Sequence, residues 1–480
     1  MRDREPATQP RGPARLTGLA ALRRAASFAR DPLGEMQRSY DSYGPCLFMR
    51  GGLPFLRRPP VVLLTVPLVL TAGAAFNREV LNNPATWRPV SLMPGGPRNS
   101  AARRLSGGLM RMNGPRHAHY RRLVGTPLRK DGLEAFDDRM VRIAAAEVAD
   151  WRADEPLDLW HNLYRLTRNL AIGLLFGGDY QHGYPIADMI AGVLQRKWAP
   201  SVIGFPVNLP ITPYGQVARQ AQTLERLILQ WADGKRGHLD NCDLASIVVN
   251  NPDVDGNPPS DATIAGQIPT LFAATAEACQ ATLLWALLLL AQHPQASGRL
   301  HDELHEALGG AAPSMATIMN LPWLDAVVKE TMRILPPVPL QMRTAQHDTT
   351  VAGCAVPKGT RLVLSAFLTN RMPDLYPDAD CFRPERWSGI NPTPFEYAVF
   401  SSGPRSCPGY GFGSRLIRVA LATVLSRYRV EFAPEARIDY RVQPTLRPAG
   451  RVPAVLRRHD GAFAPRPIRG NIRSLVRFPQ

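Results

Sequence analysis

The feature that most constrains the fold is a long helix predicted for residues 260–293. Ser260 supplies an N-terminal cap, and His293-Pro294 ends the helix. At 1.5 Å per residue, this segment is roughly 50 Å long. Because it is apolar nearly all round, it must be buried on every side. We therefore expect it to cross the middle of one large hydrophobic core.

The rest of the chain predicts a mainly α fold with small β-sheets, an α+β class. Helical patterns dominate residues 114–266 and recur in three other places, 31–43, 324–335 and 411–428. Short strands are predicted at 46–50, 61–66, 349–356 and 361–365. The Pro- and Gly-containing segments 92–112 and 200–214 are predicted to be loops.

We expect one large domain at 31–458. A flexible basic segment, 1–30, precedes it, and a basic extension, 459–480, follows it. Much of the net charge of +17 lies at these two ends. A nucleic-acid binder would carry its charge on a folded face with a recognisable motif, so nucleic acid is not an expected partner.

Composition narrows the class of protein further. Hydrophobic residues make up 45% and charged residues 20%, as in ordinary soluble globular proteins. The longest apolar run, 61–76, contains Pro67 and is too short to span a bilayer. With no signal peptide and no transmembrane anchor, the prediction is a cytoplasmic protein. The six cysteines are scattered, which indicates neither a disulfide framework nor a zinc site.

One cysteine stands in an unusual context. Residues 400–409 read Phe-Ser-Ser-Gly-Pro-Arg-Ser-Cys-Pro-Gly, directly before a predicted helix. Loop amides, the helix N-terminus and Arg405 can all stabilise a thiolate at Cys407. Such a thiolate can be a nucleophile, a redox centre or an iron ligand, whereas the simpler reading is a buried cysteine in a turn.

The spacing Phe400-x-x-Gly403-x-Arg405-x-Cys407-x-Gly409 resembles the haem-binding loop of the cytochrome P450 family. The resemblance implies that the Cys407 thiolate is the axial ligand of a haem b iron. Phe400, Arg405 and Gly409 would then belong to the haem site. The haem would lie between the long central helix and the helix that follows the cysteine loop. The resemblance covers about residues 30–458.

Three further segments resemble the same family. Glu330-Thr-Met-Arg333 and the later Phe382-Arg-Pro-Glu-Arg386 imply a buried triad with a structural role, formed by Glu330, Arg333 and Arg386. In residues 114–123, His117 and Arg121 are four apart and would bind a haem propionate from one helical face. Arg343 would reach a propionate as well.

The long helix resembles the oxygen-activating helix of the family but departs from its usual pattern. The family usually has Gly where this chain has Thr275, and Thr where it has Ala278, whereas the acid, Glu277, is retained. Ala278 has no hydroxyl to assist proton delivery. Three substitutes are open: a hydroxyl of the substrate, water leading to Glu277, or the hydroxyl of Thr275.

The resemblance implies a bacterial haem-thiolate monooxygenase of secondary metabolism that uses O2 and two electrons. The second reading is a peroxygenase or a redox-neutral isomerase or dehydratase, and the third is a non-catalytic haem protein. Small or apolar residues implied to line the pocket favour a lipophilic substrate. They are Ala274, Val338, Leu340 and Leu446.

Electrons must come from a separate reductase system with a ferredoxin or flavodoxin, because the chain shows no flavin or iron–sulfur motif. Arg121, Arg122, Arg415 and Arg418 are candidates for a basic docking face that steers such an acidic carrier. We expect the protein to be a monomer.

Overall fold

The computed structural model describes residues 14–50, 67–90, 96–238, 243–461 and 463–479. The strand predicted at 61–66 lies outside these ranges. The chain forms two compact units that interleave in sequence. The first comprises Met1–Val90, Leu340–Thr369 and Pro394–Arg405, and the second comprises Ser91–Pro339, Asn370–Thr393 and Ser406–Gln480. Helices predominate and the sheets are small, so the predicted α+β class is confirmed.

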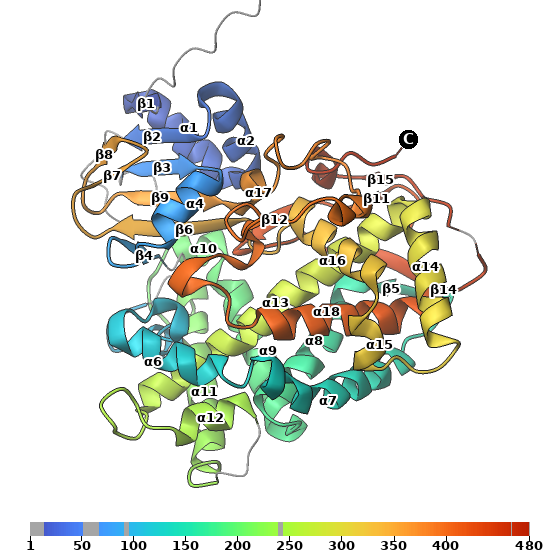
Figure 1. Ribbon diagram of the computed structural model, residues 1–480. Coiled ribbons are helices and arrows are strands. Elements are labelled where there is room, and N and C mark those ends of the chain that lie inside the picture. Colours follow the sequence, from blue (N-terminus) through green and yellow to red (C-terminus); the bar gives the residue numbers. More distant parts are fainter. Residues whose placement is uncertain (1–13, 51–66, 91–95, 239–242, 462, 480) are drawn as a thin grey trace, which may run out of the picture. The chain divides into compact units, whose positions relative to one another are not determined.

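The first unit contains a six-stranded mixed sheet with the order β1-β2-β3-β9-β6-β4 (Figure 1). Its strands are β1 Ala14–Thr17, β2 Cys46–Arg50, β3 Leu68–Thr71, β4 Trp87–Pro89, β6 Leu340–Ala345 and β9 Arg361–Ser365. Two pairs of neighbours, β1 with β2 and β3 with β9, are parallel, and the others are antiparallel. Strand β3 reads Leu-Val-Leu-Thr and is buried along its whole length, as its apolar sequence requires.

Short helices and a hairpin complete this unit. They are α1 Gly18–Arg30, α2 Pro32–Tyr43, α4 Ala74–Leu81, α17 Ala366–Thr369, η3 Ala398–Phe400, η4 Gly403–Arg405, and the hairpin of β7 Thr349–Val351 with β8 Cys354–Val356. The expectation of a flexible segment at 1–30 is wrong for residues 14–30, which form β1 and α1. Phe28 is buried, and Arg24 donates to the buried Glu35 carboxylate at 2.9 Å. Residues 1–13 lie outside the described ranges.

The second unit holds most of the helices. They are α5 Ala101–Leu105, α6 Gly114–Gly125, α7 Lys130–Ala149, α8 Leu159–Leu175, α9 Tyr180–Lys197, α10 Pro200–Gly204, α11 Pro213–Asp233, α12 Leu244–Asn250, α13 Asp261–Gln292, α14 Pro294–Leu308, α15 Met315–Met319, α16 Pro322–Ile334 and α18 Tyr410–Leu425. Three short 3-10 helices also occur, η1 Leu109–Arg111, η2 Pro384–Ser388 and η5 Asn471–Ser474.

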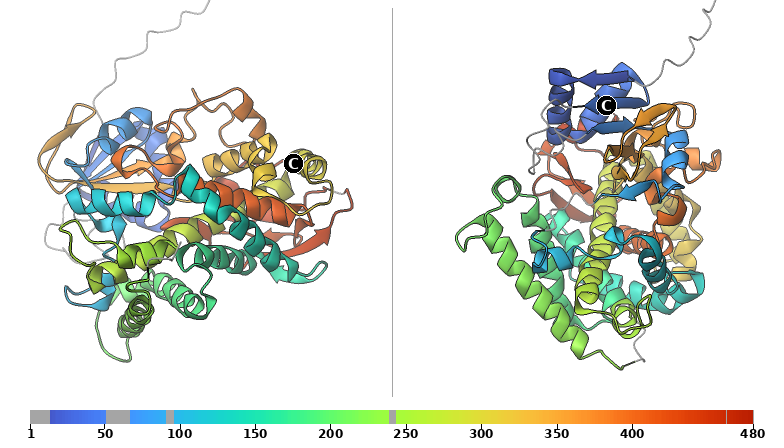
Figure 2. Two further views of the ribbon diagram at one scale, coloured as in Figure 1. Left: turned by 60° about the horizontal axis from the view of Figure 1, so that its bottom comes forward. Right: turned by 90° about the vertical axis from the view of Figure 1, so that its left-hand side faces the viewer.

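Helix α13 is the predicted central helix, and its predicted ends are confirmed to within one residue. The Ser260 hydroxyl accepts a hydrogen bond from the Thr263 amide at 3.4 Å. The helix packs against α8, α9, α11, α16 and α18 (Figures 1 and 2). Among the described residues, only α13 is long and apolar enough to cross a membrane, and most of its apolar stretch is buried in the protein.

Two segments predicted as loops contain short helices. The range 92–112 includes α5 and η1, and 200–214 begins with α10. The Ser100 hydroxyl caps α5 by accepting from the Arg103 amide at 3.2 Å. Gly108 then lies directly against Gly266 of α13, where an added Cβ would overlap the Gly266 carbonyl and the Thr270 side chain. Close backbone packing therefore holds this segment on the central helix.

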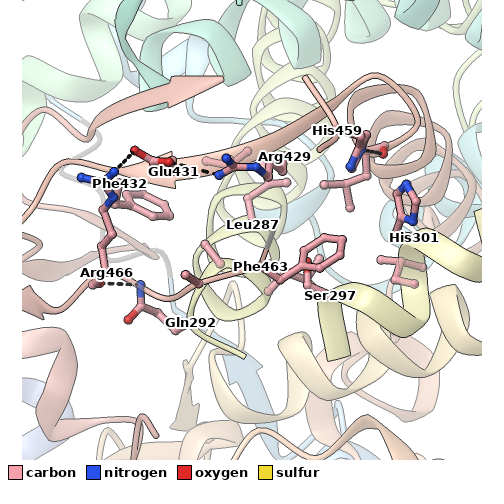
Figure 3. A pocket seen from close by; sticks show the side chains of 16 residues that line it. Leu287, Gln292, Ser297, His301, Arg429, Glu431, Phe432, His459, Phe463 and Arg466 are labelled. Atoms are coloured by element: carbon pink, nitrogen blue, oxygen red, sulfur yellow. Dashed lines mark hydrogen bonds and ion pairs between the residues drawn. The ribbon is translucent and has the colours of Figure 1, made fainter. Parts of the chain in front are cut away.

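The C-terminal extension is part of the second unit. Its strand β15 Ile468–Arg469 pairs with β11 Ala436–Arg437. Two further small sheets precede it in the chain: β5 Pro156–Asp158, β10 Tyr428–Phe432 and β14 Pro453–Arg458 form one, and β12 Tyr440–Gln443 pairs with β13 Thr445–Pro448. Figure 3 shows the tail residue Arg466 next to Glu431, with their charged groups 2.7 Å apart. The Gln292 amide also donates to the Arg466 carbonyl at 3.0 Å. The basic tail thus covers the C-terminal end of α13.

The contact between Gly108 and Gly266 gives a testable prediction. Gly108→Ala should destabilise the protein by about 1–3 kcal/mol, because the new methyl group overlaps backbone atoms that cannot move freely. Gly192→Ala in α9 is the matched control. Nothing lies within 4 Å of its added Cβ, so helix propensity should stabilise this variant by about 0.5–1 kcal/mol. Thermal unfolding followed by circular dichroism measures both, and equal melting temperatures would contradict the packing described.

Candidate functional site

Cys407 ends a loop that turns directly into α18. The Gly409 amide donates to its sulfur, and the nearby Arg121 charge also favours the thiolate. The protein atoms packed around the loop desolvate the sulfur, and this desolvation outweighs both effects, so the pKa of the Cys407 thiol is raised. The side chain nevertheless keeps an exposed surface. Thus the sulfur is reachable, and binding of a metal would displace its proton.

Helix α6 holds the cysteine loop from the side. Arg121 donates to the Ser406 carbonyl at 2.6 Å and to the Ser406 hydroxyl at 3.0 Å. His117 lies one helical turn earlier and is buried. The structure therefore places both predicted propionate ligands of α6 in the second unit, with Arg121 directly beside the residue that precedes Cys407.

The surface next to the Cys407 sulfur is lined by glycines. A Cβ added at Gly409 would meet only the Cys407 sulfur, at 3.9 Å, and one added at Gly413 would meet only the Cys279 sulfur, at 3.8 Å. Cys279 belongs to α13, which packs against α18. A flat group can therefore approach the backbone here without displacing a side chain.

The first unit contributes a separate cluster of arginines. Arg343 of β6 is buried, and within the described ranges its guanidinium donates to two neutral oxygens, those of Met342 and Gln341, at 3.1 Å each. Burial and the charge of Arg405 lower the pKa of Arg343 to about 10. Two cations side by side in a low-dielectric setting favour an anionic partner such as a propionate.

The loop backbone around this cluster is also constrained. Gly403 has a φ of +68°, and an added Cβ would lie 2.6 Å from the Leu81 carbonyl oxygen. Only glycine satisfies both conditions without strain. Phe400 ends η3, and the next residue, Ser401, donates to Gln341 at 3.0 Å. The predicted residues Phe400, Arg405 and Arg343 thus lie in the first unit.

The predicted triad is present in the second unit. Arg333 donates to the two oxygens of Glu330 at 2.9 and 2.8 Å, and Arg386 donates at 3.0 Å. The Trp387 indole and the Arg383 amide also donate to Glu330, at 3.0 and 2.9 Å. Glu330 and Arg333 are fully buried. The triad ties α16 to residues 379–387, so its contact with the cysteine loop is indirect.

The middle of α13 carries the predicted catalytic residues. Ala274 is exposed although the rest of the helix is largely buried, so this face borders open space. Burial raises the pKa of Glu277 to about 7, and the charge of Arg447 partly opposes this rise. The Ala278 carbonyl accepts from the Thr282 hydroxyl at 2.9 Å. Thr275 lies on the partly exposed stretch of the helix.

The four residues predicted to line the substrate pocket differ in exposure and do not all belong to the same unit. Ala274 and Val338 are at least partly exposed in the second unit, whereas Leu340 is partly exposed in the first. Leu446 is fully buried, and its carbonyl accepts from the Trp285 indole at 2.9 Å. Its side chain therefore packs in the core and is not available to a substrate in this conformation.

The predicted basic docking face is wrong at two of its four positions. Arg418 is buried and pairs with Asp325 of α16, and Arg415 lies 3.4 Å from the Asp137 carboxylate of α7. Both arginines therefore join helices inside the second unit. Arg121 is engaged by Ser406, which leaves Arg122 as the exposed member of the set.

Sequence reasoning missed Arg447 of β13, whose charge acts on Glu277. Its guanidinium lies over the Trp160 ring of α8, 5.5 Å from the ring centroid. Burial lowers the pKa of Arg447, and Glu277 opposes that effect. The only signal was its position directly after Leu446, a residue already assigned to the pocket.

Comparison with known proteins identifies the family. The family model described as Cytochrome P450 matches residues 63–449. The chain is 29% identical over 399 residues to the cyclooctatin synthase of Streptomyces melanosporofaciens, covering 79% of this chain and 84% of that protein. It is 26% identical to the pentalenene oxygenase of Streptomyces avermitilis, covering 75% and 81%.

The fold has a solved counterpart as well. The retinoic acid-bound structure of the cyanobacterial CYP120A1 superposes with a TM-score of 0.78 at 22% identity, covering 94% of this chain and all of that one. The chain belongs to the cytochrome P450 family, whose members bind haem. It is an oxidoreductase of the P450 monooxygenase class.

The Glu330 network yields a stability prediction. Glu330→Ala should lower the free energy of unfolding by about 3–5 kcal/mol, because Arg333 would keep its buried charge without a carboxylate partner. Glu155→Ala is the control. It removes an exposed ion pair with Arg152, which should cost less than about 1 kcal/mol. Urea unfolding of both variants measures the difference, and similar midpoints would show that the triad does not hold this region.

Proposed function

We propose that this protein is a cytoplasmic, monomeric monooxygenase that inserts one atom of O2 into a lipophilic, terpenoid-like secondary metabolite. The main observation behind the proposal is the exposed Cys407 side chain. Gly409 lies beside its sulfur, and Arg121 holds the preceding residue, Ser406, by a hydrogen bond. Relatives named for cyclooctatin and pentalenene support the substrate class. Electrons would come from a separate reductase with a ferredoxin or flavodoxin.

The residues fit haem b. Cys407 would supply a thiolate ligand to the iron, and His117, Arg121, Arg343 and Arg405 would provide positive charge for the propionates. When bound, the haem supplies the activation of O2 for insertion into a C–H bond. Phe400 and Gly409 would lie beside the ring, where the bare backbone of Gly409 leaves room for a flat group.

Proton supply is the task of Glu277 in this proposal. Reduction of O2 with insertion of one atom consumes two protons, and Ala278 has no hydroxyl to pass them on. A carboxyl group with a pKa of about 7 is protonated in half of the molecules at neutral pH, so it can both give and regain a proton. Thr275 and a hydroxyl of the substrate are the alternative donors.

The pKa of Glu277 gives a signed prediction. Since the carboxyl group donates only when protonated, product formation should fall as the pH rises through about 7. Arg447→Gln removes the charge that lowers this pKa, so the fall should move to higher pH. Glu277→Gln should be slower by about 10²–10⁴-fold and lose this pH dependence.

Thr275→Val is the matched control for this pH profile, because it removes the neighbouring hydroxyl without touching the carboxyl group. The profile should then stay as in the wild type. A wild-type pH profile in the Glu277→Gln variant would contradict the role of Glu277, and loss of product in Thr275→Val alone would assign proton delivery to Thr275.

Isotope labelling tests the reaction itself. The photoreduced holoenzyme should first give the thiolate-type ferrous–carbon monoxide band, lost in Cys407→Ala and kept in Cys279→Ala. With ¹⁸O₂ and a panel of cyclic diterpenes, the product should then carry one ¹⁸O atom. Label that enters only from H₂¹⁸O₂ would assign a peroxygenase. A product without label would assign a redox-neutral isomerase or dehydratase, and binding without any product a non-catalytic haem protein.

A further inference from the structure

A buried lysine lies at the C-terminal end of α9. The Lys197 side chain is only 5% exposed, and its ammonium group donates to the Ser106 hydroxyl at 3.3 Å. Burial and, to a smaller extent, the positive charge of Arg111 together lower the pKa of Lys197 to about 8. The lysine therefore faces a neutral hydroxyl and another cation, and no acid influences it among the described residues.

Arg111 is the second cation of this cluster. It ends η1, and its Nη1 atom is buried without a hydrogen-bond partner in the described part of the chain. Its carbonyl, by contrast, accepts from the Asn113 side chain at 3.1 Å. Burial and the charge of Arg103 lower the pKa of Arg111. A buried guanidinium nitrogen is thus left with an unused donor.

The acid Glu225 already forms an ion pair with Arg104. Glu225 of α11 accepts from Arg104 at 2.5 and 2.6 Å through both of its oxygens. Buried charges normally have a partner of opposite sign, as Arg333 has in Glu330. In the described part of the chain, neither Lys197 nor the buried Nη1 atom of Arg111 has an acidic partner, which points to an anionic ligand.

The segment that carries Arg111 and the helix that carries Lys197 both contact α13, the helix of Ala274 and Glu277. The Leu109 amide donates to the Gln267 side chain of α13 at 3.0 Å, which fixes η1 on that helix. Helix α9 packs against α13 as well. Glu277 follows Gln267 by ten residues, so about 15 Å along the helix axis separate them. A ligand bound at the two cations would extend along α13 toward Glu277.

We propose that Lys197 and Arg111 bind the carboxylate of a lipophilic substrate and so orient its apolar body along α13. This inference rests on the proposed function and narrows its substrate class to amphipathic acids. The two cations would form charge-assisted hydrogen bonds to the carboxylate oxygens. The apolar remainder would extend toward Ala274, where the helix face is exposed.

Binding of matched acids and alcohols to the holoenzyme tests the proposal by calorimetry. The pairs are geranylgeranic acid with geranylgeraniol, and tetradecanoic acid with 1-tetradecanol. In at least one pair the acid should bind about tenfold to a hundredfold more tightly than the alcohol. Lys197→Met and Arg111→Met should each reduce this preference to near unity and leave the affinity for the alcohol unchanged.

A control and a second measurement separate ligand binding from a structural role. Lys358→Met removes an exposed lysine and should keep the full preference for the acid. Without ligand, Lys197→Met should melt at the same temperature as the wild type or higher, because an unpaired buried charge is removed. A lower melting temperature together with an unchanged acid preference would assign Lys197 to structure and overturn the proposal.

The outcome is independent of the test of the proposed function. If neither acid binds more tightly than its alcohol, the inference is wrong, even when ¹⁸O from O2 enters a neutral diterpene. If the acid preference depends on Lys197 and Arg111 but no oxygenated product forms, the binding site stands and the proposed reaction fails.

Discussion

The carboxylate of Glu330 joins parts of the second unit that are far apart in the sequence. It accepts hydrogen bonds from Arg333 on its own helix, and from Arg386 and Trp387 on the segment that returns toward the cysteine loop. Because the group is fully buried, each missing donor would leave a desolvated charge. The path of residues 379–387, and hence the start of the chain leading to Cys407, depends on this one side chain.

The central helix α13 is the second constraint on the fold. Its apolar surface on all sides requires partners all round, and α8, α9, α11, α16 and α18 provide them. Two hydrogen bonds connect this helix to elements that carry cations. The Leu109 amide donates to the Gln267 side chain, and the Trp285 indole donates to the Leu446 carbonyl. These contacts place η1 and β13, with Arg111 and Arg447, at two levels of the same helix.

Features set by local pattern could be predicted from the sequence. The ends of α13 follow from Ser260 and Pro294, and the cysteine loop, Glu330, Arg333 and Arg386 follow from short motifs. Features set by distant partners could not. The sequence alone suggests that Arg415 and Arg418 are surface arginines, but they pair with Asp137 and Asp325 from other helices. Likewise, β1 pairs with β2 and Arg24 of α1 pairs with Glu35, and both partners lie outside residues 14–30.

In the proposed function, proton supply depends on electrostatics, because Ala278 has no hydroxyl. Burial raises the pKa of Glu277 and the charge of Arg447 partly opposes this rise, which leaves the pKa at about 7. Two opposing effects on one carboxyl group can thus provide a proton donor that is regenerated at physiological pH. In the proposed function, Arg447 of β13 thus helps to set the pKa at which Glu277 donates its proton.

The most direct test is the ratio of oxygenated product to hydrogen peroxide in a single turnover. It should be measured in the wild type, Glu277→Gln and Ala278→Thr with the same bound substrate. If Glu277 supplies the protons, we expect mostly product in the wild type, mostly peroxide in Glu277→Gln, and little further gain of product in Ala278→Thr. Mostly peroxide in the wild type, with product restored by Ala278→Thr, would show that Glu277 does not replace the missing hydroxyl.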